Sequence, residues 1–212
     1  MKKIVLIGDS IREGYCEYVK MAFADKAKVM FPDMNCRFST YVLRELAPWR
    51  DYFEWGSDVD AVHWNAGLWD CLRMLDGQPL VPLDEYKRNV ERICNVIKML
   101  FPEAKMIFAT STPVQEEGYT GMYKRFNADI EAYNQAAAQI VMAHGGQIND
   151  LYACMLDTPP EYHSDMTHYN TKEGTRQIAN QVIRVLEQTL ELQATPLDYD
   201  ALFAAREKIV GM

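Results

Sequence analysis

The sequence predicts an α/β fold, a three-layer α/β/α sandwich built on a five-stranded parallel sheet. Short apolar runs alternate with longer segments of helical period along the chain, which is the pattern of repeated strand–helix units. The runs at 3–8 and 105–110 are almost continuously apolar, as expected for parallel strands that helices cover on both faces. A chain of 212 residues is long enough for one well-buried domain and short for two.

The expected elements follow one another in strand–helix order. Strands are predicted near 3–8, 28–32, 60–65, 105–110 and 146–150, and helices near 12–24, 39–48, 84–100, 123–144 and 171–192. In the segment 84–100, apolar residues recur on one helical face, so this helix is expected to lie on the sheet. A short helix near 198–209 follows Pro196. We therefore expect an α/β/α domain at 1–193 and a helical appendage at 194–212.

Helix ends are marked by residues that favour them. Ser39 or Thr40 can cap the second helix by accepting a hydrogen bond from a backbone N–H, and Thr171 can cap the fifth in the same way. Gly145-Gly146 is expected to end the fourth helix, because glycine readily takes the left-handed conformation that follows many helices.

Composition excludes several classes of function. A formal net charge of −8 disfavours both a nucleic-acid groove and docking on an anionic membrane. No apolar run approaches the ~20 residues of a membrane span, and the run at 4–7 is shorter than the ~7–15 residues of a signal-peptide core. The five cysteines are widely spaced, which favours reduced thiols and no metal site. We expect a cytoplasmic protein without a cofactor, a metal or a nucleic-acid or membrane partner.

Polar residues follow every predicted strand. In an open parallel sheet, the site forms beyond the carboxyl ends of the strands. The residues at this edge are Asp9-Ser10, Asn35-Cys36, Asn65-Ala66-Gly67, Thr110-Ser111-Thr112 and the loop 157–168. One edge of the sheet therefore collects the candidate site residues.

Ser10, Asp165 and His168 supply the residue types of a nucleophile, an orienting acid and a base. Ser10 precedes a helix, where backbone N–H groups face a developing negative charge. His168 can take the hydroxyl proton and return it to a leaving group, while Asp165 holds the imidazole. Each feature alone has an ordinary structural alternative, a helix cap for Ser10 and a solvated turn for the other two. Together, in this order, they indicate an ester hydrolase.

The other histidines fit other roles. His163 lies in the same loop and is the main rival for the base, but it lacks an acid three residues upstream. His63 lies inside a predicted strand, where a packed core position is expected. His144, before two glycines, suits a helix end.

The two outer blocks resemble the GDSL-type (SGNH) hydrolase superfamily. Its N-terminal Gly-Asp-Ser-(Leu/Ile) block is similar to Gly8-Asp9-Ser10-Ile11, and its C-terminal Asp-x-x-His block to Asp165-Met166-Thr167-His168. The resemblance covers roughly residues 1–190. It implies a flavodoxin-like sandwich without a metal, with Ser10 as the nucleophile, His168 as the base and Asp165 as its orienter.

The middle blocks depart from the family pattern. The resemblance implies an oxyanion hole formed by the Ser10 N–H, a second backbone N–H and an asparagine amide. Cys36 stands where the family has glycine, and its N–H is expected to donate, although a Cys36–histidine nucleophile stays open as an alternative. Asn65 is favoured as the amide donor, and Trp69 is the alternative when the block is aligned on Gly67 and Asp70. Asn65 acting only as a turn cap also stays open.

Residues near the predicted edge suggest a substrate pocket. Asp9, Arg37, Trp69 and Tyr169 are predicted to bind substrate, whereas Arg12 is interpreted as a solvated helix-end charge. We expect a small-molecule ester with a small, acetyl-like acyl group, because the chain is compact and shows no lid domain. An O-acetylated carbohydrate follows by analogy with the family alone.

Two other classes of function and one structural question stay open. A non-catalytic carbohydrate-binding relative could keep the same fold. A phosphoester hydrolase would need clustered metal ligands or a phosphate-binding glycine loop, and the sequence shows neither. The segment 194–212 can pack on its own domain or on another subunit, so self-association is a further possibility.

Overall fold

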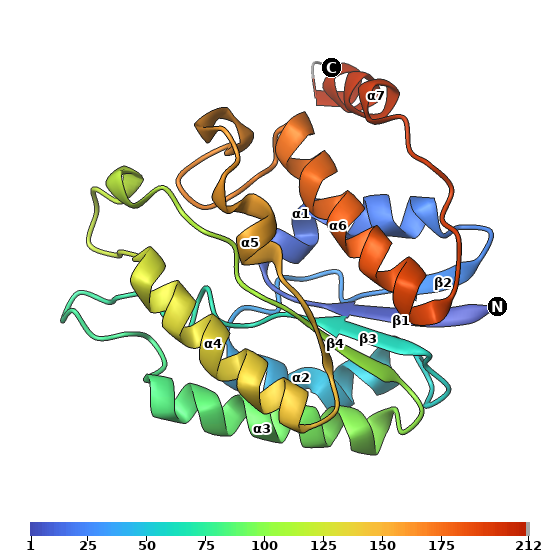
Figure 1. Cartoon of the computed structure of the whole chain (residues 1–212), viewed down its shortest axis with the longest axis horizontal. Coiled ribbons are helices and arrows are strands. Elements are labelled where there is room, and N and C mark those ends of the chain that lie inside the picture. Colours follow the sequence, from blue (N-terminus) through green and yellow to red (C-terminus); the bar gives the residue numbers. More distant parts are fainter. Residues whose placement is uncertain (211–212) are drawn as a thin grey trace.

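Five parallel strands form the central sheet. The computed structural model describes the backbone of residues 1–210 and the side chains of residues 1–205. The strands are β1 (Lys2–Ile7), β2 (Ala27–Met30), β3 (Ala61–Trp64), β4 (Lys105–Ala109) and β5 (Gln147–Asn149). Their order across the sheet is β2-β1-β3-β4-β5, and every neighbouring pair is parallel (Figure 1). The predicted five-stranded parallel sheet is confirmed, with strand ends within two residues of those expected.

Helices cover both faces of this sheet. The helices of the chain are α1 (Ser10–Ala22), α2 (Ser39–Tyr52), α3 (Leu83–Leu100), α4 (Asn127–Ala143), α5 (Leu151–Leu156), α6 (Lys172–Leu190) and α7 (Tyr199–Val210), of which α7 lies away from the sheet (Figure 1). α1 packs against α6 on one face, while α2, α3 and α4 lie on the other (Figure 1). The predicted three-layer α/β/α sandwich is therefore confirmed, and its strand order is that of flavodoxin-like folds.

The strand order reverses between β1 and β3. From β1 the chain crosses through α1 to β2 on one side, and through α2 it returns to β3 on the other. At such a point the connections diverge, which leaves a crevice beyond the carboxyl ends of the strands. β1 ends just before Ser10 and β3 just before Asn65, so both residues lie at the crevice.

Some helices differ from their expected limits. α2 continues past Pro48 to Tyr52, although proline lacks the N–H that a helical hydrogen bond requires. α4 begins at Asn127 rather than near residue 123, and α5 was not predicted. With only six residues, α5 is too short to give a clear helical period. α7 lies where a terminal helix was expected, while the domain boundary near residue 193 stays a prediction.

The predicted helix caps are partly right. The Thr171 hydroxyl accepts a hydrogen bond from the Gly174 N–H at 3.1 Å, as predicted. α4 ends before Gly145, whose φ of 74° is left-handed, which also confirms the expectation. The prediction of a Ser39 or Thr40 cap is wrong, because Phe38 occupies the cap position of α2 and Ser39 is its first residue.

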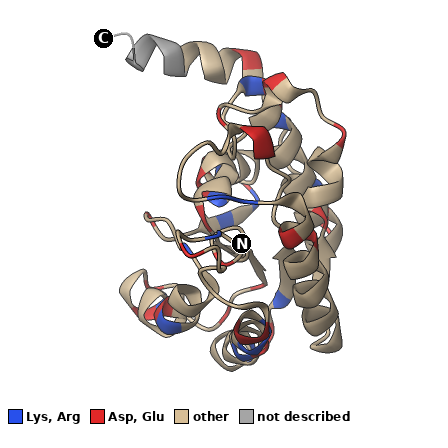
Figure 2. Cartoon of the chain, turned by 90° about the vertical axis from the view of Figure 1, so that its left-hand side faces the viewer, with Lys and Arg blue, Asp and Glu red and all other residues tan. Residues whose placement is uncertain are grey.

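Surface and length features agree with the composition. On the face shown in Figure 2, acidic and basic residues are interspersed over helices and loops. Of the helices in the described part of the chain, none has the length and apolar character to cross a membrane.

Candidate active site

Ser10 lies at the junction between β1 and α1. The preceding residue, Asp9, caps the helix, and its Oδ1 accepts a hydrogen bond from the Ile11 N–H at 3.0 Å. The alternative of Ser10 as the helix cap is therefore wrong. Because Asp9 satisfies the cap, the Ser10 hydroxyl is left to interact elsewhere. Its backbone N–H, at the first position of the helix, donates to no acceptor among the described residues.

Two hydrogen bonds link the side chains of Ser10, His168 and Asp165 in one row. His168 Nε2 lies 2.8 Å from Ser10 Oγ, and His168 Nδ1 lies 2.7 Å from Asp165 Oδ2. With Asp165 ionised, the Nδ1 position carries the proton and donates to the carboxylate, so Nε2 accepts from the Ser10 hydroxyl. The structure thus brings together the three side chains that the sequence singled out from opposite ends of the chain.

The loop around Asp165 fixes the orientation of the carboxylate. Its Oδ1 accepts hydrogen bonds from the backbone N–H groups of Thr167, at 2.7 Å, and His168, at 2.8 Å. Partial burial raises the pKa of Asp165, but these bonds and the His168 ring outweigh burial and hold the pKa below its usual range. Asp165 is therefore a carboxylate that can stabilise a positive charge on His168.

Gly8 allows Asn65 to pack against the turn that carries Ser10. A Cβ at Gly8 would lie 1.9 Å from Asn65 Oδ1 and 2.8 Å from the Cβ of Arg12. The Asn65 N–H donates to the Ile7 carbonyl at 3.0 Å, which continues the β1–β3 pairing up to the site. The side chain of Asn65 is 4% exposed, and its Oδ1 has no hydrogen-bond partner among the described residues. Asn65 thus adjoins the turn before Ser10, and its role as an oxyanion donor stays a prediction.

Cys36 is not placed as predicted. Its backbone N–H donates to the Gly8 carbonyl at 3.0 Å, so the expected contribution of Cys36 to the oxyanion hole is wrong. Burial raises the pKa of the Cys36 thiol to about 11, although the nearby Arg12 charge lowers it. At neutral pH the thiol is protonated, which argues against the Cys36 nucleophile alternative.

Arg12 is buried rather than solvated. It is 1% exposed, and its guanidinium donates to the Gly8 carbonyl at 3.4 Å and to the Met34 carbonyl at 2.5 Å. The interpretation of Arg12 as a surface charge is therefore wrong, because the loop after β2 folds over it. Arg12 ties this loop to the turn that carries the nucleophile candidate.

Two predicted substrate contacts are also wrong. Asp9 is 0% exposed, so it cannot touch a substrate and acts on α1 instead. Burial raises the pKa of Asp9, while the neighbouring Asn65 side chain, the Ile11 N–H and two arginine charges lower it. Tyr169 is 3% exposed and donates its hydroxyl to the Pro113 carbonyl at 3.0 Å. Both side chains are buried and hydrogen-bonded within the protein.

Arg37 and Trp69 remain accessible. The Arg37 guanidinium lies 5.2 Å from the centre of the Tyr41 ring, on an exposed loop beside the amino end of α2. Trp69 is partly exposed in the loop after β3. Their roles in substrate binding stay predictions.

The remaining histidines do not contact Ser10. His63 is buried between the Tyr15 hydroxyl, at 3.4 Å, and the Asn149 amide, at 3.0 Å, and burial lowers its pKa to about 4. This confirms His63 as a core residue. His144 lies at the end of α4, as expected. The His163 ring packs on the Tyr169 ring with 3.9 Å between their centres.

A buried carboxyl group near the site, that of Asp70, had no predicted role of its own. Asp70 accepts hydrogen bonds from the Ser39 N–H, at 3.0 Å, and the Ser39 hydroxyl, at 2.5 Å. Asn89 donates to the same hydroxyl at 3.0 Å, so the loop after β3 is tied to α2 and α3. Burial raises the pKa of Asp70 to about 7, against the lowering effect of the Ser39 bonds. The alignment of Gly67 and Asp70 with the family block was the only signal for this network.

A pocket of about 640 Å³ opens beside Ser10 and His168. It is lined by Ser10, Glu13, Gly14, Glu17, Tyr18, Met21, His168, Asn170, Leu202 and Ala205. Apart from Ser10, the lining residues on α1 and α7 were not predicted, because the sequence does not show that α7 returns to α1.

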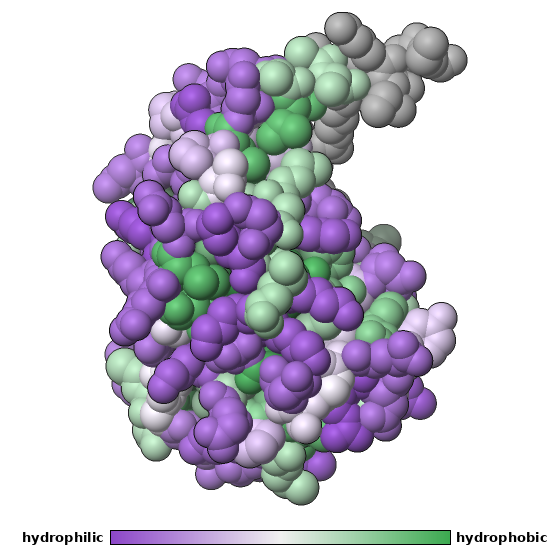
Figure 3. Space-filling view, turned by 90° about the vertical axis from the view of Figure 1, so that its right-hand side faces the viewer, coloured by the Kyte–Doolittle hydropathy of each residue, from purple (hydrophilic) through white to green (hydrophobic). Residues whose placement is uncertain are grey.

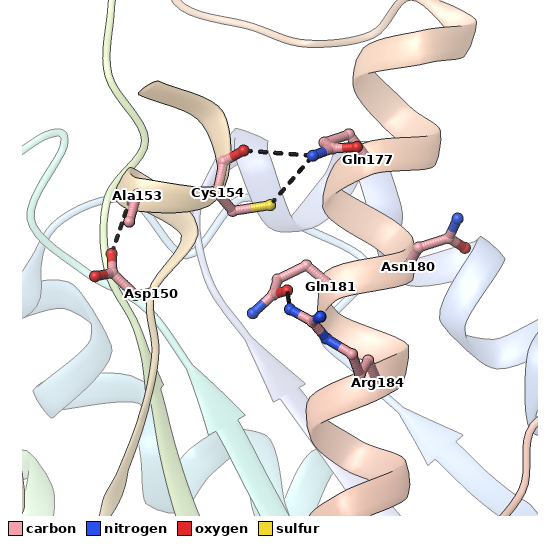
Figure 4. Close-up of a pocket in the computed structure, with 7 residues that line it drawn as sticks. All are labelled: Asp150, Ala153, Cys154, Gln177, Asn180, Gln181 and Arg184. Atoms are coloured by element: carbon pink, nitrogen blue, oxygen red, sulfur yellow. Dashed lines mark hydrogen bonds between the residues drawn. The ribbon is translucent and has the colours of Figure 1, made fainter. Parts of the chain in front are cut away.

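A second hollow of about 480 Å³ lies between α5 and α6. Figure 4 shows Gln177 hydrogen-bonded to Cys154 and Arg184 to Gln181, whereas Asn180 points away from these side chains. It contains none of the predicted site residues. In the described part of the chain, no three His, Cys, Asp or Glu side chains are grouped to hold a metal ion.

Comparisons with known proteins give a relative that is an esterase/lipase. A GDSL esterase/lipase from Arabidopsis thaliana is 27% identical over 178 residues, which cover 74% of this chain and 73% of that protein. No protein-family model matches the chain.

Solved structures share the fold. A lipase/acylhydrolase from Enterococcus faecalis has a TM-score of 0.72 at 21% identity, covering 93% of this chain and 100% of that one. An acetylxylan esterase from Geobacillus stearothermophilus, solved as a catalytic mutant, has a TM-score of 0.68 at 18% identity, covering 86% and 93%. With the curated relative, these matches confirm the resemblance to GDSL-type hydrolases.

Proposed function

We propose that this protein is a serine esterase or acylhydrolase that cleaves small carboxylic esters through an acyl-enzyme. The observation that carries the proposal is the row from Ser10 Oγ through the His168 ring to Asp165, with distances of 2.8 and 2.7 Å. A serine hydroxyl that donates to an imidazole, which itself donates to a carboxylate, is the geometry that general-base activation requires.

The reaction follows from this geometry. Ser10 Oγ attacks the ester carbonyl carbon while its proton passes to His168 Nε2, and Asp165 stabilises the resulting imidazolium. When the tetrahedral intermediate collapses, the C–O bond to the alcohol breaks and His168 gives its proton to the leaving oxygen. Water then attacks the acyl-enzyme, again losing a proton to His168, and releases the acid and free Ser10.

The negative charge of the tetrahedral intermediate needs hydrogen-bond donors. The Ser10 N–H lies at the amino end of α1, where the helix dipole also favours negative charge. The Asn65 amide beside Gly8 is the proposed second donor, with Trp69 as the alternative. Cys36 is not a donor, because its N–H is already bonded to Gly8.

Small esters, including O-acetylated carbohydrates, are the proposed substrate class. The similarity to a GDSL esterase/lipase and to acetylxylan esterases supports ester cleavage. The exposed carboxylates of Glu13 and Glu17 at the edge of the pocket favour uncharged esters over anionic ones.

A fluorophosphonate probe and p-nitrophenyl acetate together test the proposal. We expect one probe molecule per chain, attached to Ser10 when the labelled protein is digested and analysed by mass spectrometry. Hydrolysis of p-nitrophenyl acetate should stop after labelling. Folded protein that is neither labelled nor active would instead indicate the non-catalytic carbohydrate-binding alternative.

A further inference from the structure

We infer that α1 and α7 together form a subsite for a linear apolar chain of the ester substrate, with α7 as its outer wall. The inference rests on the proposed function and specifies the substrate class of the same site. It concerns the C-terminal segment, for which the sequence indicated no role. The apolar chain belongs either to the acyl group or to the alcohol, and the experiment below separates these two sources.

The pocket is continuous with the reacting atoms. Ser10 and His168 line it together with Leu202 and Ala205 of α7. Its volume of about 640 Å³ falls within the range of about 300–1,000 Å³ typical of sites that enclose small organic ligands. An acetyl group has only two carbons and leaves most of this space empty. The expectation of an acetyl-like substrate assumed that nothing covers the site, whereas α7 borders it.

Aromatic contacts hold α7 in place as a wall. The Tyr18 ring of α1 stacks on Tyr199, at 5.7 Å between ring centres, and on Phe203, at 5.9 Å. Stacked rings of this kind add to the stabilisation that their burial already gives. Figure 3 shows hydrophobic side chains near the upper end of this face of the molecule.

Polar contacts fix the start of the same helix. Tyr199 is 6% exposed, and its hydroxyl donates to Asn180 Oδ1 at 3.0 Å. Asp200 pairs with Lys172 at 2.6 Å, which links α7 to the first turn of α6. α7 is thus attached to both α1 and α6 at its amino end, and Leu202 and Ala205 farther along the helix border the pocket.

The chemistry of the lining selects the occupant. Tyr18, Met21, Leu202 and Ala205 present carbon atoms, and hydrocarbon groups gain free energy when such surfaces remove them from water. The carboxylates of Glu13 and Glu17 stand at the edge of the same pocket and repel anionic groups. An uncharged hydrocarbon chain attached to the ester therefore fits this pocket better than a phosphate, a carboxylate or a bare acetyl group.

Neighbouring alanines on α7 provide a matched pair of variants. Ala205 lines the pocket, while Ala204 is exposed and is not among the lining residues. Ala205→Trp fills part of the pocket with an indole ring, and Ala204→Trp adds the same ring outside it. Circular dichroism and thermal unfolding check that both variants fold.

Two series of esters measure the effect. In one, p-nitrophenyl acetate is compared with p-nitrophenyl hexanoate; in the other, methyl acetate is compared with hexyl acetate. Each buried methylene is worth about fourfold in binding, so excluding two or three of them lowers the long-to-short ratio of kcat/KM about tenfold or more. We expect this loss for Ala205→Trp in one of the two series, which identifies the acyl or the alcohol chain as the occupant. Equal ratios for wild type, Ala204→Trp and Ala205→Trp in both series would overturn the inference.

A binding measurement separates this inference from the proposed function. In the Ser10→Ala background, hexyl acetate and methyl hexanoate are titrated and followed by NMR, so no catalysis is needed. Weaker binding with Ala205→Trp than with Ala204→Trp supports the subsite even if the protein proves to be no esterase. The opposite result is ester hydrolysis that depends on Ser10 together with binding that Ala205→Trp does not change. That result would contradict the subsite and still support the esterase proposal.

Discussion

His168 Nε2 lies 2.8 Å from Ser10 Oγ, although 158 positions of sequence separate the two residues. The contact exists because α1 and α6 pack on the same face of the sheet, and each has its amino end at the edge beyond the carboxyl ends of the strands. Ser10 is the first residue of α1, and His168 ends the loop that leads into α6. The hydroxyl and the imidazole are therefore brought together by the packing of the helices, and not by proximity in the sequence.

Removing either partner of this contact should abolish ester hydrolysis. We expect Ser10→Ala and His168→Ala each to lower kcat/KM for p-nitrophenyl acetate about 10³-fold or more, because the nucleophile or its base is lost. Asp165→Asn should also lower kcat, because Nδ1 loses the carboxylate that orients the ring. Steady-state kinetics on the purified variants measures these effects.

His163→Ala is the matched control for the base. His163 lies in the same loop but packs on Tyr169 rather than beside Ser10, so its loss should change kcat/KM less than about tenfold. A His168→Ala variant that keeps wild-type activity, with His163→Ala inactive, would show that the wrong histidine has been identified.

Two substitutions distinguish the candidate oxyanion donors. Asn65→Ala removes the amide beside Gly8, and loss of one such donor typically costs about 10²–10³-fold in kcat. Trp69→Phe keeps an aromatic ring but removes the indole N–H. We expect the large loss in kcat for Asn65→Ala, with KM changed little. If Trp69→Phe shows the loss instead, Trp69 is the donor and Asn65 serves the packing of Gly8.

Long-range features of the fold were predictable, whereas local hydrogen-bond partners were not. The runs around Ile4 and Ile107 predicted buried strands because such strands need apolar residues on both faces. The rule that sites form at the carboxyl edge of the sheet then placed Ser10 and His168 together. The prediction that the Cys36 N–H donates to the oxyanion was wrong, because this N–H bonds to the Gly8 carbonyl once its loop closes. No pattern of residues in the sequence predicts that closure.

The burial of Arg12 and Tyr169 could not be predicted from the sequence either. Arg12 resembles a solvated helix residue in the sequence, but the loop after β2 covers it and provides the Met34 carbonyl as an acceptor. Tyr169 was predicted to bind substrate as an aromatic loop residue near the site, yet its hydroxyl donates to the Pro113 carbonyl. In both cases the deciding contact comes from a segment distant in sequence, so residue type alone could not reveal it.

Gly8 should be intolerant of any side chain. Gly8→Ala places a methyl group against Asn65 Oδ1 and Arg12, and overpacking of this kind costs about 1–3 kcal/mol of unfolding free energy. Urea unfolding of the variant measures the loss. Gly121→Ala is the control, since a Cβ there meets nothing within 4 Å.

A double variant tests the cause of that loss. If the clash with Asn65 is responsible, Gly8→Ala should cost less unfolding free energy in an Asn65→Ala background than in the wild type. Strictly additive costs would mean that Arg12 or the backbone, rather than Asn65, resists the methyl group.

Asp70 should make the stability depend on pH near neutrality. Burial raises its native pKa to about 7 from an ordinary value of 3.8, so the carboxyl group ionises earlier in the unfolded chain than in the folded one. Its contribution to stability is therefore fully present below about pH 4 and is lost as the pH rises towards 7.

The variant Asp70→Asn tests this dependence, because it resembles the protonated form and keeps an oxygen that can accept a hydrogen bond from Ser39. We expect the unfolding free energy of the wild type to fall relative to Asp70→Asn between pH 4.5 and 7.5, by on the order of 2–4 kcal/mol. Urea unfolding at several pH values measures this difference, and Asp76→Asn, which removes an exposed carboxylate, is the control. If the wild type and Asp70→Asn change in parallel over this range, Asp70 is ionised in the folded protein throughout, and the network with Ser39 and Asn89 holds a charge rather than a neutral acid.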